Sequence, residues 1–181
     1  MSSLIVPRDR MRILFVHGAY QMADRFSVRG TGIAHEQVRS ADAMLTRAGE
    51  ADVVCVSIMW RNEVLAACPR VRFVQSISAG IDQYDVPQFK QRGVRLASAA
   101  GVNANAVAEH ALSMILALRR QLHTGRDNQA KAFWRPMMST IAEREAELAG
   151  ATAVIVGFGR IGDRKSTRLN SSHLVISYAV F

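Results

Sequence analysis

The chain has 181 residues, of which 49% are apolar and 21% charged, and its formal net charge is +8. This apolar content excludes a disordered chain, and the longest nearly unbroken apolar run, residues 111–118, is far shorter than the ~20 residues that span a membrane. The 23 lysines and arginines form no run of five and no stripe between aromatics, so we expect no nucleic-acid partner.

The N-terminal residues lack the apolar segment of a secretion signal. Two cysteines, Cys55 and Cys68, cannot form a disulfide framework. We therefore expect a cytoplasmic protein in which both thiols are packing residues.

Short apolar runs alternate with helical patterns over the first hundred residues. Strands are predicted at residues 12–16, 52–58, 71–77 and 94–97. Helices are predicted at residues 35–48 before Gly49, at 62–68 after Asn62, and after Asp85, with Pro87 in the first turn and Gly93 at the end. This alternation indicates βαβ units and a mostly parallel sheet.

A long helix is predicted next, from a cap at Asn103 or Asn105 to about residue 122. Its segment 111–118 is apolar nearly all round, so we expect it to pack between two domains or against a partner chain. Residues 123–148 are predicted to be an exposed connector that contains Trp134. A fifth strand is predicted at residues 151–157.

A glycine turn follows that strand directly. Gly157, Gly159 and Gly162 fit the pattern G-x-G-x-x-G. The first glycine allows a tight turn, the second lets backbone approach a pyrophosphate, and the third lets the next helix pack closely on the strand. The pattern after a strand favours dinucleotide binding over a simple turn.

The segment after this turn does not continue the pattern. Residues 163–172 are polar and have no apolar face at helical spacing, whereas residues 174–181 are apolar to the last position. The segment has the character of translated adapter or vector sequence. We therefore expect residues 163–181 to be a non-native tail.

Three stretches in order resemble one family: residues 65–82, residues 103–119, and Trp134 with residues 147–150 and 154–162. They are similar to the D-isomer-specific 2-hydroxyacid dehydrogenases. The resemblance implies a flavodoxin-like substrate domain at residues 1–100. It further implies a hinge helix and the start of a Rossmann domain at residues 101–162. It also implies that the full-length protein forms a homodimer.

The resemblance also assigns binding residues. Backbone N–H groups of Ala79 and Gly80, with Ser78 beside them, correspond to the positions that hold the carboxylate of a small 2-oxoacid substrate. Val107 matches a residue that lies against the nicotinamide of NAD or NADP, between which the sequence does not discriminate. The remaining cofactor positions are those of the turn: Gly157, Phe158, Gly159, Arg160, Ile161 and Gly162.

The family's catalytic Arg, Glu and His all lie downstream of the nucleotide turn, so no catalytic residue is predicted before residue 163. Glu109 and His110 are adjacent on a helix, about 100° apart, and cannot form an acid/base pair. His17 ends a strand and is a minor candidate for a position facing the cleft, as His110 is for chemistry. His35 and His123 are predicted at the surface, and His173 lies in the tail. No metal site is predicted.

Two alternatives remain open. The first is a non-catalytic flavodoxin-like module that binds a ligand or a partner, which has no use for the hinge helix or the glycine turn. The second is another Rossmann enzyme with the same turn, which the loop at Ala79 and Gly80 disfavours. The preferred hypothesis is a fragment of an NAD(P)-dependent oxidoreductase of glyoxylate, hydroxypyruvate or phosphoglycerate type, inactive by itself.

Overall fold

The structure is a computed structural model that describes residues 6–157, 159–162 and 175–179, with side chains as far as Gly162. The chain separates into two compact units, Met1–Ala100 and Gly101–Phe181. No helix among the described residues has both the length and the apolar character needed to cross a membrane.

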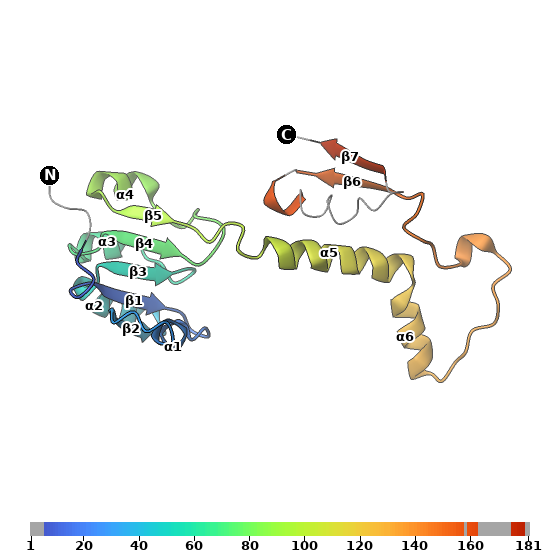
Figure 1. Cartoon of the computed structure of the whole chain (residues 1–181), viewed down its shortest axis with the longest axis horizontal. Coiled ribbons are helices and arrows are strands. Elements are labelled where there is room, and N and C mark those ends of the chain that lie inside the picture. The colour runs from blue at the N-terminus through green and yellow to red at the C-terminus, as the bar shows by residue number, and fades with distance from the viewer. Residues whose placement is uncertain (1–5, 158, 163–174, 180–181) are drawn as a thin grey trace. The chain divides into compact units, whose positions relative to one another are not determined.

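The first unit is built on a five-stranded sheet (Figure 1). Its strands are β1 (Arg12–Val16), β2 (Ala34–Val38), β3 (Val53–Val56), β4 (Phe73–Ser76) and β5 (Arg95–Ala97). All four pairings are parallel, and the order is β2-β1-β3-β4-β5. This is the flavodoxin-like order, in which the direction of winding reverses between β1 and β3. The predicted α/β class with a parallel sheet is confirmed.

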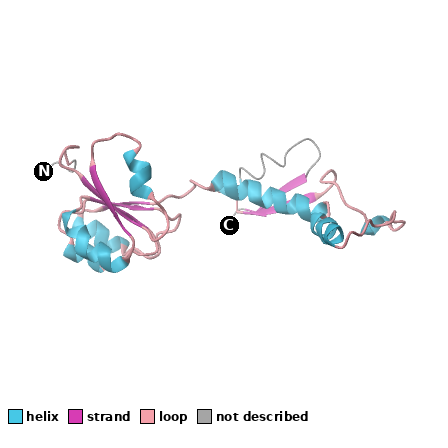
Figure 2. Ribbon diagram, turned by 90° about the horizontal axis from the view of Figure 1, so that it is seen from below, coloured by secondary structure: helices cyan, strands magenta, loops and turns pink. Residues whose placement is uncertain are grey.

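Helices cover both faces of this sheet (Figure 2). They are α1 (Met22–Ser27), α2 (Ala41–Arg47) with the 3-10 turn η1 (Ala48–Glu50), α3 (Glu63–Ala67) and α4 (Val86–Arg92). The main core lies between the sheet and α2, α3 and α4, and its fully buried side chains include Leu14, Val54, Val74, Met44, Leu65 and Phe89. Side chains alternate between the faces of a strand, so Phe15 lies opposite Leu14 and packs on Phe26 of α1 at 5.5 Å between ring centroids.

The two ends of α4 follow from its sequence signals. The Asp85 side chain accepts a hydrogen bond from the backbone N–H of Gln88 at 3.1 Å, as an N-cap does. Pro87 lies in the first turn, and Gly93 ends the helix at a φ of +66°, a left-handed conformation that glycine adopts without strain. Asn62, in contrast, makes no cap bond; its side-chain oxygen accepts hydrogen bonds from Trp60 Nε1 and the Asp85 N–H.

One predicted helix is wrong in its first half. Residues 34–38 form strand β2, which pairs with β1 over five residues, and the helix begins only after Ser40, whose Oγ accepts from the Ala43 N–H. The buried positions are Met44 and Ala48, four residues apart. The spacing that suggested a helix from residue 35 therefore ran across a strand, a turn and a helix. His35, predicted at the surface, is half-buried, and its ring packs against that of Phe26 with centroids 5.0 Å apart.

The second unit contains helices α5 (Ala104–Arg119) and α6 (Leu122–Ala130), the 3-10 turn η2 (Ile141–Glu143) and strands β6 (Thr152–Val156) and β7 (Val175–Ala179). Gln121, at a φ of 51°, separates α5 from α6, so the long helix ends before residue 122 and the predicted connector is partly helical. The connector returns to α5, where the Ala146 N–H donates to the Arg119 carbonyl at 2.9 Å. Strands β6 and β7 pair in parallel. Residues 163–174, 180 and 181 of the predicted tail lie outside the described residues.

Candidate functional site

The predicted substrate loop, residues 78–80, follows β4 and Ile77 at the carboxyl edge of the parallel sheet. Ala79 and Gly80 are exposed, and Ser78 is half-buried. Within the described residues, the N–H groups of Ala79 and Gly80 have no hydrogen-bond partner. Two adjacent free amides in a loop after a strand are donors that can bind an anion together.

Serine side chains hold this loop in place. The hydroxyl of Ser78 is hydrogen-bonded to that of Ser57, at the end of the neighbouring strand β3. The fully buried Ser76 accepts from the Ser78 N–H at 3.2 Å, and the Ala99 N–H donates to the Ser78 carbonyl at 2.9 Å. The loop is therefore fixed from both neighbouring strands. Sequence reasoning missed Ser57 and Ser76, although a serine at the end of an apolar strand is a usable signal.

A second loop, residues 17–20, lies at the same edge after β1. His17 Nδ1 accepts from the N–H groups of Ala19 at 3.0 Å and Tyr20 at 2.7 Å. The His17 ring stacks on that of Tyr20 with centroids 4.1 Å apart. A Cβ added at Gly18 would lie 3.2 Å from the end of the Met59 side chain, so this loop contacts the one after β3. Because β1 and β3 flank the reversal of winding, this is the place where ligands bind in open α/β sheets.

The glycine turn of the second unit has the geometry that its sequence requires. Gly157 has a φ of +86°, and a Cβ at Gly162 would overlap the Gly157 carbonyl oxygen. A Cβ at Gly159, in contrast, would meet nothing within 4 Å, which leaves its backbone approachable. Gly157 and Gly162 thus have the positive φ and the crowding of a tight strand-to-helix turn, and pyrophosphate binding at Gly159 stays a prediction. Phe158 lies outside the described residues.

The other predicted cofactor residues lie in the same unit. Ile161 is exposed, and the Arg160 side chain lies so close to Gly101 that any Cβ there would overlap it. Val107, in the first turn of α5, is 37% exposed. Apolar residues further along the helix are also exposed, with Met114 at 51% and Leu118 at 69%. The described part of the chain therefore leaves much of the apolar surface of α5 uncovered.

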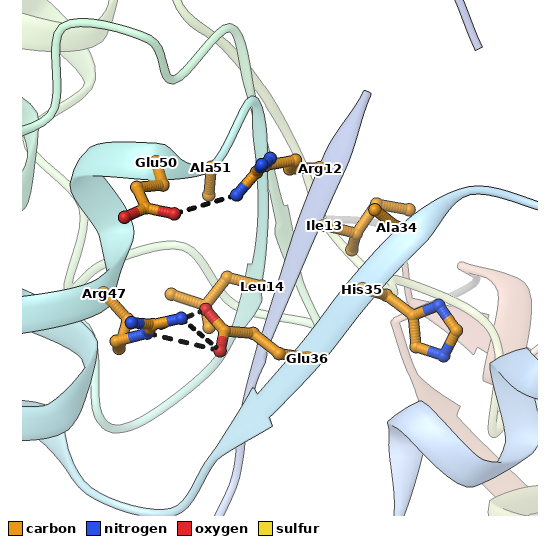
Figure 3. Close-up of a pocket in the computed structure, with 9 residues that line it drawn as sticks. All are labelled: Arg12, Ile13, Leu14, Ala34, His35, Glu36, Arg47, Glu50 and Ala51. Carbon is orange, nitrogen blue, oxygen red and sulfur yellow. Dashed lines mark hydrogen bonds and ion pairs between the residues drawn. The ribbon is translucent and has the colours of Figure 1, made fainter. Parts of the chain in front are cut away.

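A pocket of about 180 Å³ lies at the opposite, amino edge of the sheet (Figure 3). Its charged groups pair with one another: Arg12 with Glu50 at 2.8 Å, and Arg47 with Glu36 at 2.9 Å. The hydrogen bonds from Arg47 to Glu36 raise the pKa of the Arg47 guanidinium. His35 projects away from both ion pairs (Figure 3). Both ion pairs are about half exposed, so the charged groups that line this pocket already have partners.

Reactive groups are few among the described residues. No cluster of three histidine, cysteine or acidic side chains suited to a metal ion is found in this part of the chain. Burial raises the pKa of the Cys55 thiol to about 11 and also raises that of Cys68, which disfavours the nucleophilic thiolate at both. Glu109 and His110 are both exposed on α5.

Comparison with known proteins identifies relatives of this architecture. The family model for the D-isomer specific 2-hydroxyacid dehydrogenase catalytic domain matches residues 17–172. A glyoxylate reductase from Thermofilum pendens is 34% identical over 120 residues, which are 64% of this chain and 34% of that protein. A D-3-phosphoglycerate dehydrogenase from Mycobacterium bovis is 32% identical over 130 residues, which are 71% of this chain and 24% of that protein. The chain thus spans about a third or less of the length of these relatives.

Solved structures share the fold. The D-lactate dehydrogenase of Aquifex aeolicus, crystallised with NAD and lactic acid, superposes with a TM-score of 0.75 at 20% identity, over 92% of this chain and 50% of that one. A formate dehydrogenase from Staphylococcus aureus, in complex with NAD, gives a TM-score of 0.69 at 19% identity, over 93% and 56%. The family match covers most of the chain, and the parallel sheet and glycine turn agree with it: the chain belongs to the D-isomer specific 2-hydroxyacid dehydrogenase family.

Proposed function

We propose that this chain supplies the substrate-binding part, and the beginning of the cofactor-binding part, of an NAD- or NADP-dependent oxidoreductase that interconverts a small 2-oxoacid and its D-2-hydroxyacid. The first unit, residues 1–100, would bind the oxoacid, and residues 101–162 would begin the nucleotide-binding domain. Family membership supports this assignment, as do the names of the relatives, which include glyoxylate reductase and D-3-phosphoglycerate dehydrogenase.

The observation on which the proposal rests is the pair of free N–H groups at Ala79 and Gly80. A carboxylate that binds there accepts two charge-assisted hydrogen bonds, each stronger than a bond to a neutral carbonyl. The bond between Ser78 and Ser57 fixes the loop beforehand, so binding requires little ordering of the protein. A 2-oxoacid held by its carboxylate presents C2 in a defined position, as a redox reaction at that carbon requires.

The nucleotide turn fits a dinucleotide on its own geometry. The open space beside Gly159 admits a pyrophosphate, and Gly157, Arg160 and Gly162 would shape the turn around it. Val107 would contact the nicotinamide. When bound, the cofactor would donate or accept the hydride, and the residues of this chain would hold the cofactor in position. NAD and NADP are both compatible with the described residues, and the structures crystallised with NAD or NADPH support a nicotinamide cofactor.

Hydride transfer also needs an acid/base group and a cation that grips the substrate. The proposal assigns neither to a residue of this chain, because the resemblance places an Arg, a Glu and a His after the nucleotide turn. We therefore expect the 181-residue chain to bind the 2-oxoacid without catalysing its reduction. The exposed apolar surface of α5 further supports a homodimer for a longer chain, because a second copy would cover it. A cytoplasmic location remains part of the proposal.

A titration followed by nuclear magnetic resonance tests the function. Glyoxylate is added to the ¹⁵N-labelled chain, and the amide signals of Ala79 and Gly80 are followed together with those of Gly30 and Gly32, which lie elsewhere in the first unit. Selective, saturable shifts at Ala79 and Gly80 are expected. Uniform shifts, or none at these two amides, would leave the chain a flavodoxin-like module without an oxoacid site.

A further inference from the structure

The loop after β1 is a second feature of the carboxyl edge, and the role inferred for it rests on the proposed function. This loop, residues 17–20, and the substrate loop follow β1 and β4, so both lie at the carboxyl edge of the parallel sheet. A cavity of about 720 Å³ extends from Ala19 and Tyr20 of the first loop, past Cys55 of β3, to Ile77, which joins β4 to the substrate loop. Residues of α1 and of the segment before it line much of the rest of this cavity.

His17 is oriented in this loop by its own backbone. Its Nδ1 accepts two backbone N–H groups, those of Ala19 and Tyr20, so the hydrogen of the ring is on Nε2. Stacking on Tyr20 further fixes the ring plane. Within the described residues, Nε2 has no hydrogen-bond partner. His17 thus presents a fixed, unused donor at the edge of the sheet.

The loop is rigid because side chains of β2 and of the residue after it bind its backbone. Gln37 donates to the carbonyls of His17 at 3.2 Å and Tyr20 at 2.5 Å, and accepts from the Met22 N–H at 2.8 Å. Arg39 donates to the Gly18 carbonyl at 3.1 Å. These hydrogen bonds from two side chains fix the backbone of the loop and thereby the position of His17 Nε2.

The spacing of the strands sets the length of ligand that fits. Strand β3 separates β1 from β4, so the two loops begin two strand spacings apart, or about 10 Å. An extended three-carbon 2-oxoacid with an oxygen on C3 can accept one hydrogen bond at its carboxylate and one at that oxygen. The two protein donor atoms that make these bonds are then also roughly 10 Å apart. Ile58, between the loops at the end of β3, is 79% exposed and offers apolar surface to the carbons between.

We propose that His17 determines substrate specificity by donating a hydrogen bond from Nε2 to an oxygen on C3 of the bound 2-oxoacid. The carboxylate is held at Ala79 and Gly80, and the C3 oxygen at His17. The site therefore prefers hydroxypyruvate or its phosphate ester to pyruvate. Glyoxylate, which has no C3, uses only the first contact.

The test compares hydroxypyruvate with pyruvate, which differ only in the C3 hydroxyl. Affinities for the 181-residue chain are measured by amide titration, as for glyoxylate. The decisive variant is His17→Asn, whose side-chain oxygen can still accept the Ala19 N–H in an Asx turn but which has no donor at the position of Nε2. His17→Gln returns a donor near that position, and His110→Asn, on the exposed surface of α5, is the control.

We expect hydroxypyruvate to bind about three- to tenfold more tightly than pyruvate, the contribution of one hydrogen bond. His17→Asn should reduce this ratio to about one without changing the affinity for pyruvate, and His17→Gln should restore part of it. 3-Phosphohydroxypyruvate, measured in parallel, shows whether the C3 oxygen preferred is a hydroxyl or a phosphate ester.

An unchanged ratio in His17→Asn overturns the inference, and so does an equal loss for both oxoacids, which would mean that His17 acts only on the shape of the loop. If neither oxoacid shifts the amides of Ala79 and Gly80, the proposed function itself is wrong and the inference fails with it. The two failures are therefore distinguishable.

Discussion

Replacing Gly80 by valine separates ligand binding from folding in the substrate loop. Gly80 is exposed and its φ is not positive, so valine meets no backbone strain. A Cβ there would contact only the Asp82 carboxylate, at 3.2 Å, and that flexible side chain can move. We therefore expect the free energy of unfolding to change by no more than about 0.5 kcal/mol.

The affinity of the Gly80→Val variant for glyoxylate should, in contrast, fall strongly. The isopropyl group stands beside the N–H on which the carboxylate depends, and a hydrogen bond to a charged group contributes about 1.5–3 kcal/mol. Losing one such bond weakens binding about 10- to 100-fold. Affinity for glyoxylate is measured by amide titration, and stability by urea denaturation followed by circular dichroism.

The matched control is Gly93→Ala, which introduces a side chain at a φ of +66° at the end of α4. It should lower the free energy of unfolding by about 1 kcal/mol and leave affinity unchanged, the reverse of the Gly80→Val pattern. An unaltered affinity in Gly80→Val would refute the anion site. A large loss of stability in that variant would show that the loop is packed in a way that the structure does not have.

Four further predictions concern other parts of the chain. Phe89→Ala should destabilise the first unit by about 3–5 kcal/mol in urea, because the ring is buried against two other aromatic rings; a loss below about 1 kcal/mol would contradict this. Gly162→Ala should reduce hydrogen-exchange protection in β6 while leaving the first unit unchanged, since the added methyl overlaps the Gly157 carbonyl oxygen; unaltered protection in β6 would exclude the tight turn. Because burial raises the pKa of Cys55 from 9.0 to about 11, this thiol should react with iodoacetamide at pH 8 about 100-fold more slowly in the folded chain than in the urea-unfolded chain. The free energy of unfolding should also fall as the pH rises from 9 towards 11, because the thiol of the unfolded chain ionises in this range and that of the folded chain does not. Equal reaction rates in the two states would mean that the folded chain has an accessible thiolate. Deleting residues 163–181 should leave the unfolding midpoint of the first unit unchanged, because its five-stranded sheet ends at β5, and loss of that transition would show that the deleted segment is needed.

Local sequence signals predicted the elements whose causes are local. The strand at β1 follows from a continuous apolar run, which a strand covered on both faces requires. The cap at Asp85 and the stop at Gly93 act within three or four residues of the helix that they bound. The glycine turn was likewise predictable, because the positive φ of Gly157 and the crowding at Gly162 are properties of a single short segment.

Strand β2 shows what the sequence by itself left undetermined. His35 and Gln37 belong to an edge strand whose side chains are partly polar, and their conformation is fixed by pairing with β1. The candidate site has the same character. The carboxyl edge and the loop at Gly80 were predicted, but the hydroxyl pair of Ser57 and Ser78 joins residues 21 positions apart.

The chain alone therefore determined its composition class, its apolar strands, the two ends of α4 and the glycine turn. Tertiary structure decided the order of the strands, the reversal of winding between β1 and β3, and the placement of the His17 loop and the substrate loop at the same edge of the sheet. The physical reason is the range of the interactions. Caps and turns are satisfied by neighbours along the chain, whereas strand order and site geometry depend on hydrogen bonds and packing between segments that only the folded sheet brings together.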